Sequence, residues 1–599
     1  MNDPPPEAAR VKPRISALRG QIGGVLDYYE ETDYESRNET RLAELRKLTF
    51  QFQAFTPMLK SEMRPGSRAF NHTWVEKPGK SRLTCADVKR KGQEATGDTF
   101  SPTPHSASQR VLEICALKYN WPVIDADLTS AFLIAKDQGT SEGQPCYLRP
   151  PPEYDEVLAE WLKGQPKEVQ QQLQNRDRRD IVLQMDGNLY GRRTAGAQYR
   201  DELESVLVSE MLPYGYKFVR GKRDATVYRC TVTGIRLYHH VDDFRATGPP
   251  EELWRLFTED LKKAGLELKV SQLQYPGSKV DSLGKTRVRT EDAFLTIPDP
   301  KHARNIISKL GLEGAKSSKV AGKKLVLTEA TKTPLNPQQA ETYKSCTGSA
   351  MYLAQDRRDI QFETKELARH IHEPRECDLV NLKILARYLI GTPDVAIITK
   401  LDEASRGPNT PVTMASFADT DWAGCLETRR STTGEVQSAG GAVMETVCQT
   451  QPGLPATSSG EAETRGISKC AQGNIYLKAL IEEDFGLTVE SLSNTLWTDS
   501  SAALQAAKRL GVGKMRHVEV AHLFVQDALK LKLFKIGKID GKLNPANALT
   551  KHLPPGEKAQ VYPLLGLVDL SEPSLQKAVT EAAQLVVAGI SDKPSKPVQ

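Results

Sequence analysis

The 599-residue sequence lacks any run of about 18 apolar residues, the length that a membrane-crossing helix needs. Its first residues, Met1 to Pro6, lack the basic-then-apolar pattern of a secretory signal peptide. The nine cysteines form no C-x-x-C pair, so the sequence indicates neither a zinc site nor a disulfide framework. No tandem repeat is evident. We therefore expect an intracellular protein, cytoplasmic or nuclear, with reduced thiols and no membrane partner.

The composition is that of an ordinary globular protein, with 39% apolar and 26% charged residues. A chain of this length has room for about three or four domains. The formal net charge of +5 is mild and does not by itself indicate a nucleic-acid partner. Local motifs must therefore indicate the function.

Two adjacent aspartates, Asp242 and Asp243, lie between two short strand patterns at 235–241 and 244–247. This arrangement predicts a hairpin with both carboxylates at its tip. Carboxylates held on rigid strands suit Mg²⁺, which binds a few carboxylates together with water and substrate phosphates. Asp-Asp is also ordinary turn chemistry, so this stretch alone leaves both interpretations open.

A second acidic strand end lies far upstream, where the apolar stretch 121–128 carries Asp127. An aspartate at the end of a buried strand is costly unless a cation meets it, which makes Asp127 a candidate metal ligand. Helical patterns at about 196–210 and 250–264 and a strand pattern at 266–270 complete a βαββαβ order. That order would bring three aspartates to one edge of an antiparallel sheet, where they could hold two divalent ions for in-line phosphoryl transfer.

A pair of cations, Lys80 and Arg82, is predicted on one face of a hairpin formed by strands 73–77 and 80–85 around Pro78-Gly79. Such a pair could hold a triphosphate. A solvated strand face explains it equally well. Around this hairpin we expect a helix from about Glu39 to Phe55 and an inserted segment at 148–183.

A second group of acids occurs in the last third of the chain. Asp419 and Asp499 each end a predicted strand, and Glu463 follows a capping-box pattern at 458–461 in a predicted helix. Each acid alone is also consistent with a helix cap or a solvated strand end.

Three motifs, in this order, resemble those of the reverse transcriptase of copia-type long-terminal-repeat retrotransposon Pol polyproteins: Asp127-Leu128-Thr129-Ser130-Ala131-Phe132-Leu133, Leu189-Tyr190-Gly191 and His240-Val241-Asp242-Asp243. The resemblance implies that Asp127, Asp242 and Asp243 are catalytic metal ligands. It also implies that the Phe132 ring lies under the deoxyribose and excludes a 2′-hydroxyl. Lys80 and Arg82 would contact the incoming triphosphate.

Four later segments are similar to the ribonuclease H part of the same polyproteins: Phe417 to Gly424, Ser458 to Glu463, Lys514 to His517, and Ala546 to Lys551. This similarity implies a second two-Mg²⁺ site whose ligands are Asp419, Glu463, Asp499 and Asn547.

The sequence departs from the family at three positions. His240 replaces a tyrosine, Thr194 replaces a glutamine near the nucleotide, and Asn547 replaces an aspartate. If the closing segment is misaligned, Asn547 is instead a helix N-cap, for which asparagine is well suited. We find no aspartic-protease motif, zinc knuckle or integrase His/Cys cluster, so we expect a fragment of the usual polyprotein, or a degenerate or captured copy.

The resemblance implies an α+β architecture: a right-hand polymerase with fingers, a βαββαβ palm and a helical thumb and connection, followed by an RNase H-like α/β domain. The expected segments are an N-terminal extension at 1–60, fingers and palm at 61–275, thumb and connection at 276–405, the RNase H-like domain at 410–555 and a C-terminal tail at 556–599.

The implied activity is that of an RNA-directed DNA polymerase with ribonuclease H, a nucleotidyltransferase and endonuclease of a mobile element. Its cofactor would be Mg²⁺, two ions per site, with Mn²⁺ as an alternative. Its partners would be an RNA template, a DNA primer, an RNA–DNA hybrid and deoxynucleoside triphosphates. The alternative is a non-catalytic nucleic-acid-binding remnant that keeps the fold.

Overall fold

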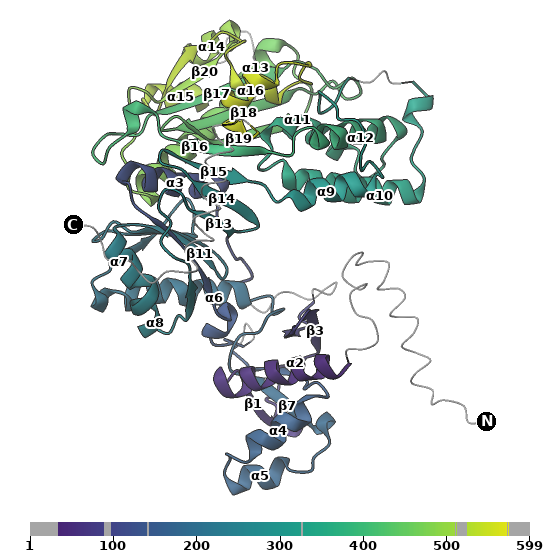
Figure 1. The fold of residues 1–599 in the computed structure, drawn as a ribbon, viewed down its shortest axis with the longest axis vertical. Helices are drawn as coiled ribbons and strands as arrows, with labels where there is room; N and C mark the ends of the chain where they lie inside the picture. The colour runs from purple at the N-terminus through teal and green to yellow at the C-terminus, as the bar shows by residue number, and fades with distance from the viewer. Residues whose placement is uncertain are drawn as a thin grey trace. The chain divides into compact units, whose positions relative to one another are not determined.

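The computed structural model describes residues 34–88, 98–139, 143–324, 328–509, 511, 524–571 and 573. These residues form several sheets and many helices, which confirms the predicted α+β class (Figure 1). The motif Lys514 to His517 lies outside the described residues. Among the described helices, none combines the length and the apolar character needed to cross a bilayer.

The chain divides into two compact units. Unit 1 comprises Met1–Ser101 and Ser130–Ser205, and unit 2 comprises Pro102–Thr129 and Val206–Gln599. Each unit is built on its own sheets, and each is described by itself below.

Unit 1 contains a four-stranded sheet in the order β1-β7-β6-β2 and a separate hairpin, β3-β4. Strand β7 is antiparallel to both of its neighbours, whereas β2 is parallel to β6. The elements are α2 (Tyr34–Arg46), η1 (Lys47–Gln51), β1 (Phe55–Leu59), η2 (Lys60–Glu62), β2 (Arg68–Phe70), β3 (His72–Lys77), β4 (Lys80–Cys85), η3 (Ala131–Ile134), β6 (Cys146–Leu148), α4 (Tyr154–Leu162), α5 (Lys167–Leu173), η4 (Arg178–Asp180), β7 (Ile181–Met185) and α6 (Ala195–Ser205).

Two expectations for unit 1 are wrong in detail. The helix expected at 39–55 ends in a π-helical turn at Gln51, because the chain then turns to begin β1 at Phe55. The segment 148–183 is integral to the unit and is not an insertion. Its last residues supply β7 in the middle of the sheet, and α4 buries Tyr154 and Val157 in the core.

Unit 2 begins with a six-stranded antiparallel sheet in the order β12-β5-β11-β10-β9-β8. The predicted hairpin is present, and its strand ends lie within one residue of the expected ones. This part contains α3 (Ser106–Tyr119), β5 (Val123–Leu128), η5 (Val206–Glu210), η6 (Leu212–Tyr214), β8 (Phe218–Arg220), β9 (Val227–Cys230), β10 (Arg236–His240), β11 (Asp243–Thr247), α7 (Pro250–Arg255), η7 (Leu256–Asp260), α8 (Leu261–Lys263) and β12 (Leu268–Val270).

Two five-stranded sheets follow in unit 2. The antiparallel sheet β13-β14-β15-β16-β22 comprises β13 (Lys279–Ser282), β14 (Lys285–Arg289), β15 (Ala293–Ile297), β16 (Val395–Lys400) and β22 (Leu567–Asp569). The mixed sheet β19-β18-β17-β20-β21 comprises β17 (Met414–Asp421), β18 (Thr432–Ala439), β19 (Ala442–Thr450), β20 (Thr495–Thr498) and β21 (Lys535–Lys538).

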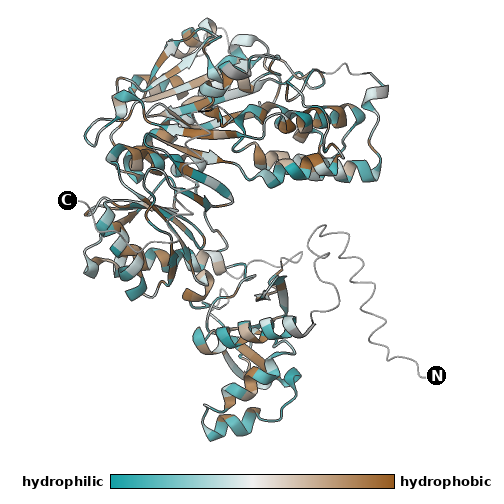
Figure 2. Ribbon diagram, viewed as in Figure 1, coloured by the Kyte–Doolittle hydropathy of each residue, from teal (hydrophilic) through white to brown (hydrophobic). Residues whose placement is uncertain are grey.

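The helices of this region are α9 (Pro300–Lys309), η8 (Ala330–Lys332), α10 (Pro337–Leu353), η9 (Arg358–Ile360), α11 (Gln361–Arg369), α12 (Glu376–Ile390), η10 (Glu403–Ser405), α13 (Ser459–Ala479), η11 (Leu480–Asp484), α14 (Ser501–Lys508), α15 (Phe524–Lys530), η13 (Pro545–Leu549) and α16 (Lys558–Leu564). Figure 2 shows brown and teal residues around the same helices, as expected of amphipathic helices with one buried face. Strand β22, within the expected C-terminal tail, pairs with β16 and buries Leu567, and Leu565 at the end of α16 is also buried.

Helix α3 joins the first sheet of unit 2 to the other two. Its apolar residues Val111 and Leu112 belong to one core cluster with Tyr238 of the first sheet and Met414 of the last. Its carboxylate at Glu113, fully buried, accepts hydrogen bonds from Arg287 Nη1 at 2.6 Å and Thr399 Oγ1 at 2.7 Å. The helix is therefore fixed by both apolar packing and a buried ion pair.

Replacing Glu113 by Ala should destabilise unit 2 strongly, because the Arg287 guanidinium would remain buried without its carboxylate. Removing one partner of a buried pair costs about 3–5 kcal/mol. Removing an exposed partner costs about 1 kcal/mol or less, so Asp527→Ala, which breaks the exposed pair with Lys530, is the control. Urea unfolding measures both. Equal midpoint shifts in the two variants would contradict the role given to Glu113.

Candidate functional site

The first carboxylate cluster lies at one end of the β10-β11 hairpin in unit 2. Asp127 on β5 and Asp243 on β11 are directly opposite each other in the antiparallel ladder. Asp242 is in the two-residue turn before β11, and its carbonyl oxygen accepts a hydrogen bond from the Leu128 amide at 2.8 Å. Val241 in the same turn has φ 57°, a backbone conformation that β-branched residues rarely adopt. The backbone of this turn is therefore strained at Val241 and is held in place by the hydrogen bond between Leu128 and Asp242.

The same row of the sheet carries two basic neighbours. His240 is opposite Asp243, and Lys269 is opposite Asp127, so the row runs His240, Asp243, Asp127, Lys269. Burial, followed by the negative charges of Asp242 and Asp127, raises the pKa of Asp243 to about 6. Carboxylates that repel one another in this way are stabilised by a shared cation, which makes the three aspartates candidate ligands of a divalent ion.

The second cluster is the more compact one. One carboxylate oxygen from each of Asp419, Glu463 and Asp499 lies within 4.8 Å of the others, whereas the three aspartates of the first cluster do not form so tight a group among the described residues. Strands β17 and β20 run parallel with Ala418 opposite Thr498, so Asp419 and Asp499 follow the same position on neighbouring strands. Glu463 comes from α13, whose N-cap Ser458 accepts a hydrogen bond from the Glu461 amide.

Burial and mutual repulsion dominate the electrostatics of the second cluster. Burial, then the charges of Asp419 and Asp499, raise the pKa of Glu463 to about 9, and among the described residues its buried Oε2 has no hydrogen-bond partner. Burial likewise raises the pKa of Asp419, although Thr550 Oγ1 donates a hydrogen bond to its Oδ2 at 2.5 Å. A buried acceptor with no partner among crowded carboxylates is the donor set that a hard divalent cation needs.

Asn547 lies in the closing segment, residues 544–551, which packs beside the second cluster. It lies inside the short 3₁₀ helix η13, whose N-cap is Asn544, so the alternative in which Asn547 is the cap is wrong. Its Nδ2 donates to the Gly541 carbonyl oxygen at 3.2 Å. Thr550, three residues later, contacts both the Asn547 carbonyl oxygen and Asp419. The segment therefore packs against the cluster through Thr550.

The predicted nucleotide contacts belong to unit 1, on the hairpin that the sequence indicates. Lys80 is exposed at the start of β4, and the Arg82 guanidinium lies over the Tyr190 ring, 4.8 Å from its centroid. The Phe132 ring meets the same tyrosine edge-on at 5.1 Å. The structure thus brings Arg82 and Phe132 to one aromatic ring. Thr194 is buried nearby in sequence, with its hydroxyl unpaired among the described residues.

Sequence reasoning missed one pair beside the first cluster. Asp125 forms an ion pair with Arg245. These residues lie two positions from Asp127 and Asp243 on the same two strands. The available signal was the Asp-Ala-Asp alternation at 125–127, which places both acids on one face of a strand.

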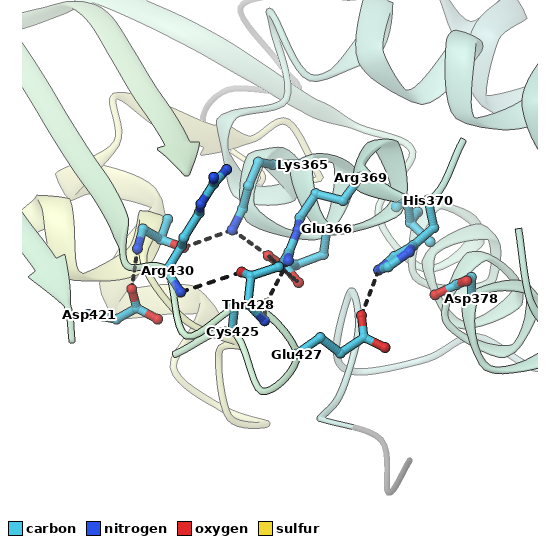
Figure 3. Close-up of polar contacts among 12 residues, drawn as sticks. Lys365, Glu366, Arg369, His370, Asp378, Asp421, Cys425, Glu427, Thr428 and Arg430 are labelled. Atoms are coloured by element: carbon cyan, nitrogen blue, oxygen red, sulfur yellow. Dashed lines mark hydrogen bonds and ion pairs between the residues drawn. The ribbon is translucent and has the colours of Figure 1, made fainter. Parts of the chain in front are cut away.

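A cavity of about 260 Å³ lies in unit 2 beside the second cluster, between α11, α12, the loop after β17 and the closing segment. Its lining residues include Asp421, Thr550, Arg369 and Cys425. Figure 3 shows the polar contacts of Asp421, Arg369 and Cys425. Arg369 Nη2 and the Thr428 amide both donate to the Cys425 sulfur. Burial acts to raise the pKa of Cys425, but these hydrogen bonds outweigh it and hold the pKa below its usual value.

No protein-family model matches the chain. It is similar to proteins named retrovirus-related Pol polyprotein from transposon RE2 and from transposon RE1, both of Arabidopsis thaliana. It is 23% identical to each over 479 residues, which cover 79% of this chain and 30% and 29% of theirs. It is also 23% identical over 526 residues to the retrovirus-related Pol polyprotein from transposon TNT 1-94 of Nicotiana tabacum, covering 84% of this chain and 36% of that protein.

The chain thus spans about a third of the length of the curated relatives it matches. The resemblance to Pol polyproteins of copia-type retrotransposons is confirmed.

Cys425 should react with iodoacetamide at a lower pH than an ordinary cysteine, because its depressed pKa leaves more thiolate at a given pH. Arg369→Ala should raise that pKa and shift the pH profile of alkylation upward. Cys448 is the internal control, since burial raises the pKa of its thiol to about 12. Site-resolved mass spectrometry over pH 6–10 measures both, and identical profiles before and after the substitution would contradict the contact.

Proposed function

We propose that the chain is an RNA-directed DNA polymerase fused to a ribonuclease H, both dependent on Mg²⁺ or Mn²⁺. The observation that carries the proposal is the presence in one chain of two separate carboxylate clusters, one on the paired strands β5 and β11 and one formed by β17, α13 and the residue after β20. The order of the motifs and the similarity to Pol polyproteins support it. In this proposal the six-stranded sheet is the palm of a right-hand polymerase, and the last five-stranded sheet with α13 is the RNase H-like domain.

In the polymerase centre, Asp127 and Asp243 would hold the metal ions from opposite strands, and Asp242 would approach them from the turn. Bound Mg²⁺ supplies charge neutralisation at the reacting phosphate and lowers the pKa of the primer hydroxyl. Asp243 must be ionised to bind a cation, and its raised pKa means that protons compete with the metal below about pH 6. Polymerase activity should therefore fall steeply on the acid side.

Unit 1 would supply the nucleotide contacts. The Arg82 guanidinium is held over the Tyr190 ring, which limits its freedom before a triphosphate arrives. Lys80 is exposed on the same hairpin face and would add a second positive charge. Phe132 packs against the same tyrosine, so its ring has a fixed support from which to exclude a 2′-hydroxyl. The substrates would be an RNA template, a DNA primer and deoxynucleoside triphosphates.

In the ribonuclease centre, Asp419, Glu463 and Asp499 would hold the ions that act on the RNA strand of an RNA–DNA hybrid. Thr550 would fix the orientation of Asp419 through its hydrogen bond. The unpaired Oε2 of Glu463 is the oxygen most in need of a cation. Asn547 would add a neutral oxygen ligand through its Oδ1, while its Nδ2 donates to the Gly541 carbonyl oxygen.

The alternative function is a nucleic-acid-binding remnant without turnover. Two observations favour it: the aspartates of the first cluster are less tightly grouped than the acids of the second, and the Asn547 amide is engaged with a backbone carbonyl. The remnant would bind an RNA–DNA hybrid and show no metal-dependent extension or cleavage. Primer extension on an RNA template, with and without EDTA, separates the two functions.

Two substitutions should separate the proposed activities, because the two clusters are on different sheets. Asp242→Asn should abolish primer extension and leave cleavage of RNA in a hybrid nearly intact, and Asp499→Asn should do the reverse. Each variant is the control for the other when extension and cleavage are assayed on one hybrid. Loss of both activities in either folded variant would show that the two-centre assignment is wrong.

Asn547→Asp should lower the Mg²⁺ concentration for half-maximal hybrid cleavage, because hard cations bind largely by charge and the change adds one. Primer extension should keep its Mg²⁺ dependence. The matched control is Asn336→Asp, which adds the same charge at the exposed N-cap of α10. A Mg²⁺ titration that shifts only polymerase activity, or shifts equally in both variants, would count against a ligand role for Asn547.

A further inference from the structure

One ion pair lies directly behind the first carboxylate cluster. Asp127 is opposite Asp243, and two residues along each strand Asp125 is opposite Arg245. Side chains two residues apart on a strand point to the same face, so the pair occupies the next row on the face that carries the aspartates. The separation between the two rows is about 7 Å, two residues of strand rise.

Four hydrogen bonds converge on Asp125. Arg245 Nη1 and Gln274 Nε2 each donate to its Oδ2 at 2.5 Å. Ser282 Oγ donates to its Oδ1 at 2.8 Å, and Ser271 Oγ accepts from its backbone amide at 3.0 Å. These partners come from β11, from β13 and from the segment after β12, so Asp125 ties three parts of unit 2 to β5. Although burial acts to raise it, the pKa of Asp125 is lowered by Arg245 and Gln274, which keeps this carboxylate charged.

Stability alone does not account for this row. Arg245 is 1% exposed, yet its Nε and Nη2 have no hydrogen-bond partner in the described residues. The hydroxyl of Tyr238, opposite Arg245 on β10, is also buried and unpaired there. A buried donor without a partner destabilises the folded state, and apolar residues in the same positions would not. A costly polar row behind a candidate metal site indicates a role in the site.

We propose that the Asp125–Arg245 pair is a positioning device for the first cluster, which holds β5 and β11 so that Asp127 and Asp243 present their carboxylates to one metal site. The pair fixes the register and the relative rotation of the two strands two residues from the aspartates. Arg245 also neutralises Asp125, which would otherwise add a further negative charge behind three acids. The inference rests on the proposed polymerase function only for the reaction that the cluster serves.

The experiment uses the 599-residue chain with the second cluster disabled by Asp419→Asn and Asp499→Asn. Mn²⁺ binding is titrated by electron paramagnetic resonance, and thermal stability is measured alongside. Arg245→Met should weaken Mn²⁺ binding on the order of tenfold, the lower end of what outer partners of a metal site contribute, and should lower the melting temperature. Arg245→Lys, which keeps the charge, should recover part of the affinity.

The decisive variant is the apolar double substitution Asp125→Val with Arg245→Met. Replacing a buried pair by apolar residues is often neutral for stability, so the melting temperature should return close to that of the parent. Mn²⁺ affinity should remain weak, because the directional bonds are gone. The matched control, Asp292→Val with Lys400→Met, removes an exposed ion pair in the same unit and should leave Mn²⁺ binding unchanged.

A double variant with parental Mn²⁺ affinity would overturn the proposal, and so would one that fails to fold, since both results assign the pair to the fold alone. Primer extension by the unmodified chain is measured separately. Absence of extension together with the expected Mn²⁺ pattern would contradict the polymerase function and leave the positioning role standing.

Discussion

Repulsion between carboxylates that the fold forces together is the constraint on which unit 2 depends. The first cluster takes its acids from β5, from β11 and from the turn before β11, and the second takes its acids from β17, from the residue after β20 and from helix α13. Burial first, and the neighbouring carboxylates second, raise the pKa of Asp243 to about 6 and that of Glu463 to about 9. Only a rigid scaffold can hold like charges at such positions, so the surrounding sheets must supply that rigidity.

The two sheets meet this constraint in different ways. In the first, an antiparallel ladder sets Asp127 opposite Asp243, and the Asp125–Arg245 pair braces the next row. In the second, β17 and β20 run parallel, with Asp419 and Asp499 directly after the paired residues Ala418 and Thr498, and α13 supplies Glu463. Helix α3 packs against both of these sheets through one hydrophobic core, and its Glu113 forms an ion pair with Arg287 on β14. The sheets of unit 2 are therefore joined through this helix.

Local pattern was enough to predict the parts of the site that lie at strand ends. The alternation before Asp243 and Asp127 and the capping box before Glu463 are readable within about ten residues of chain. The pattern could not show that 558–569 adds a strand to a sheet begun at 279, because that pairing is made only in three dimensions. The sequence pattern could not predict the Asp125–Arg245 contact for the same reason, since the two residues are 120 positions apart in the chain.

We propose that both clusters bind divalent cations, and anomalous diffraction from Mn²⁺-soaked crystals of the chain tests this most directly. The account predicts anomalous peaks between Asp127 and Asp243 and among Asp419, Glu463 and Asp499, and the removal of each by substitution of its own aspartate. The absence of a peak at either cluster at millimolar Mn²⁺, with the carboxylates ordered, would contradict it.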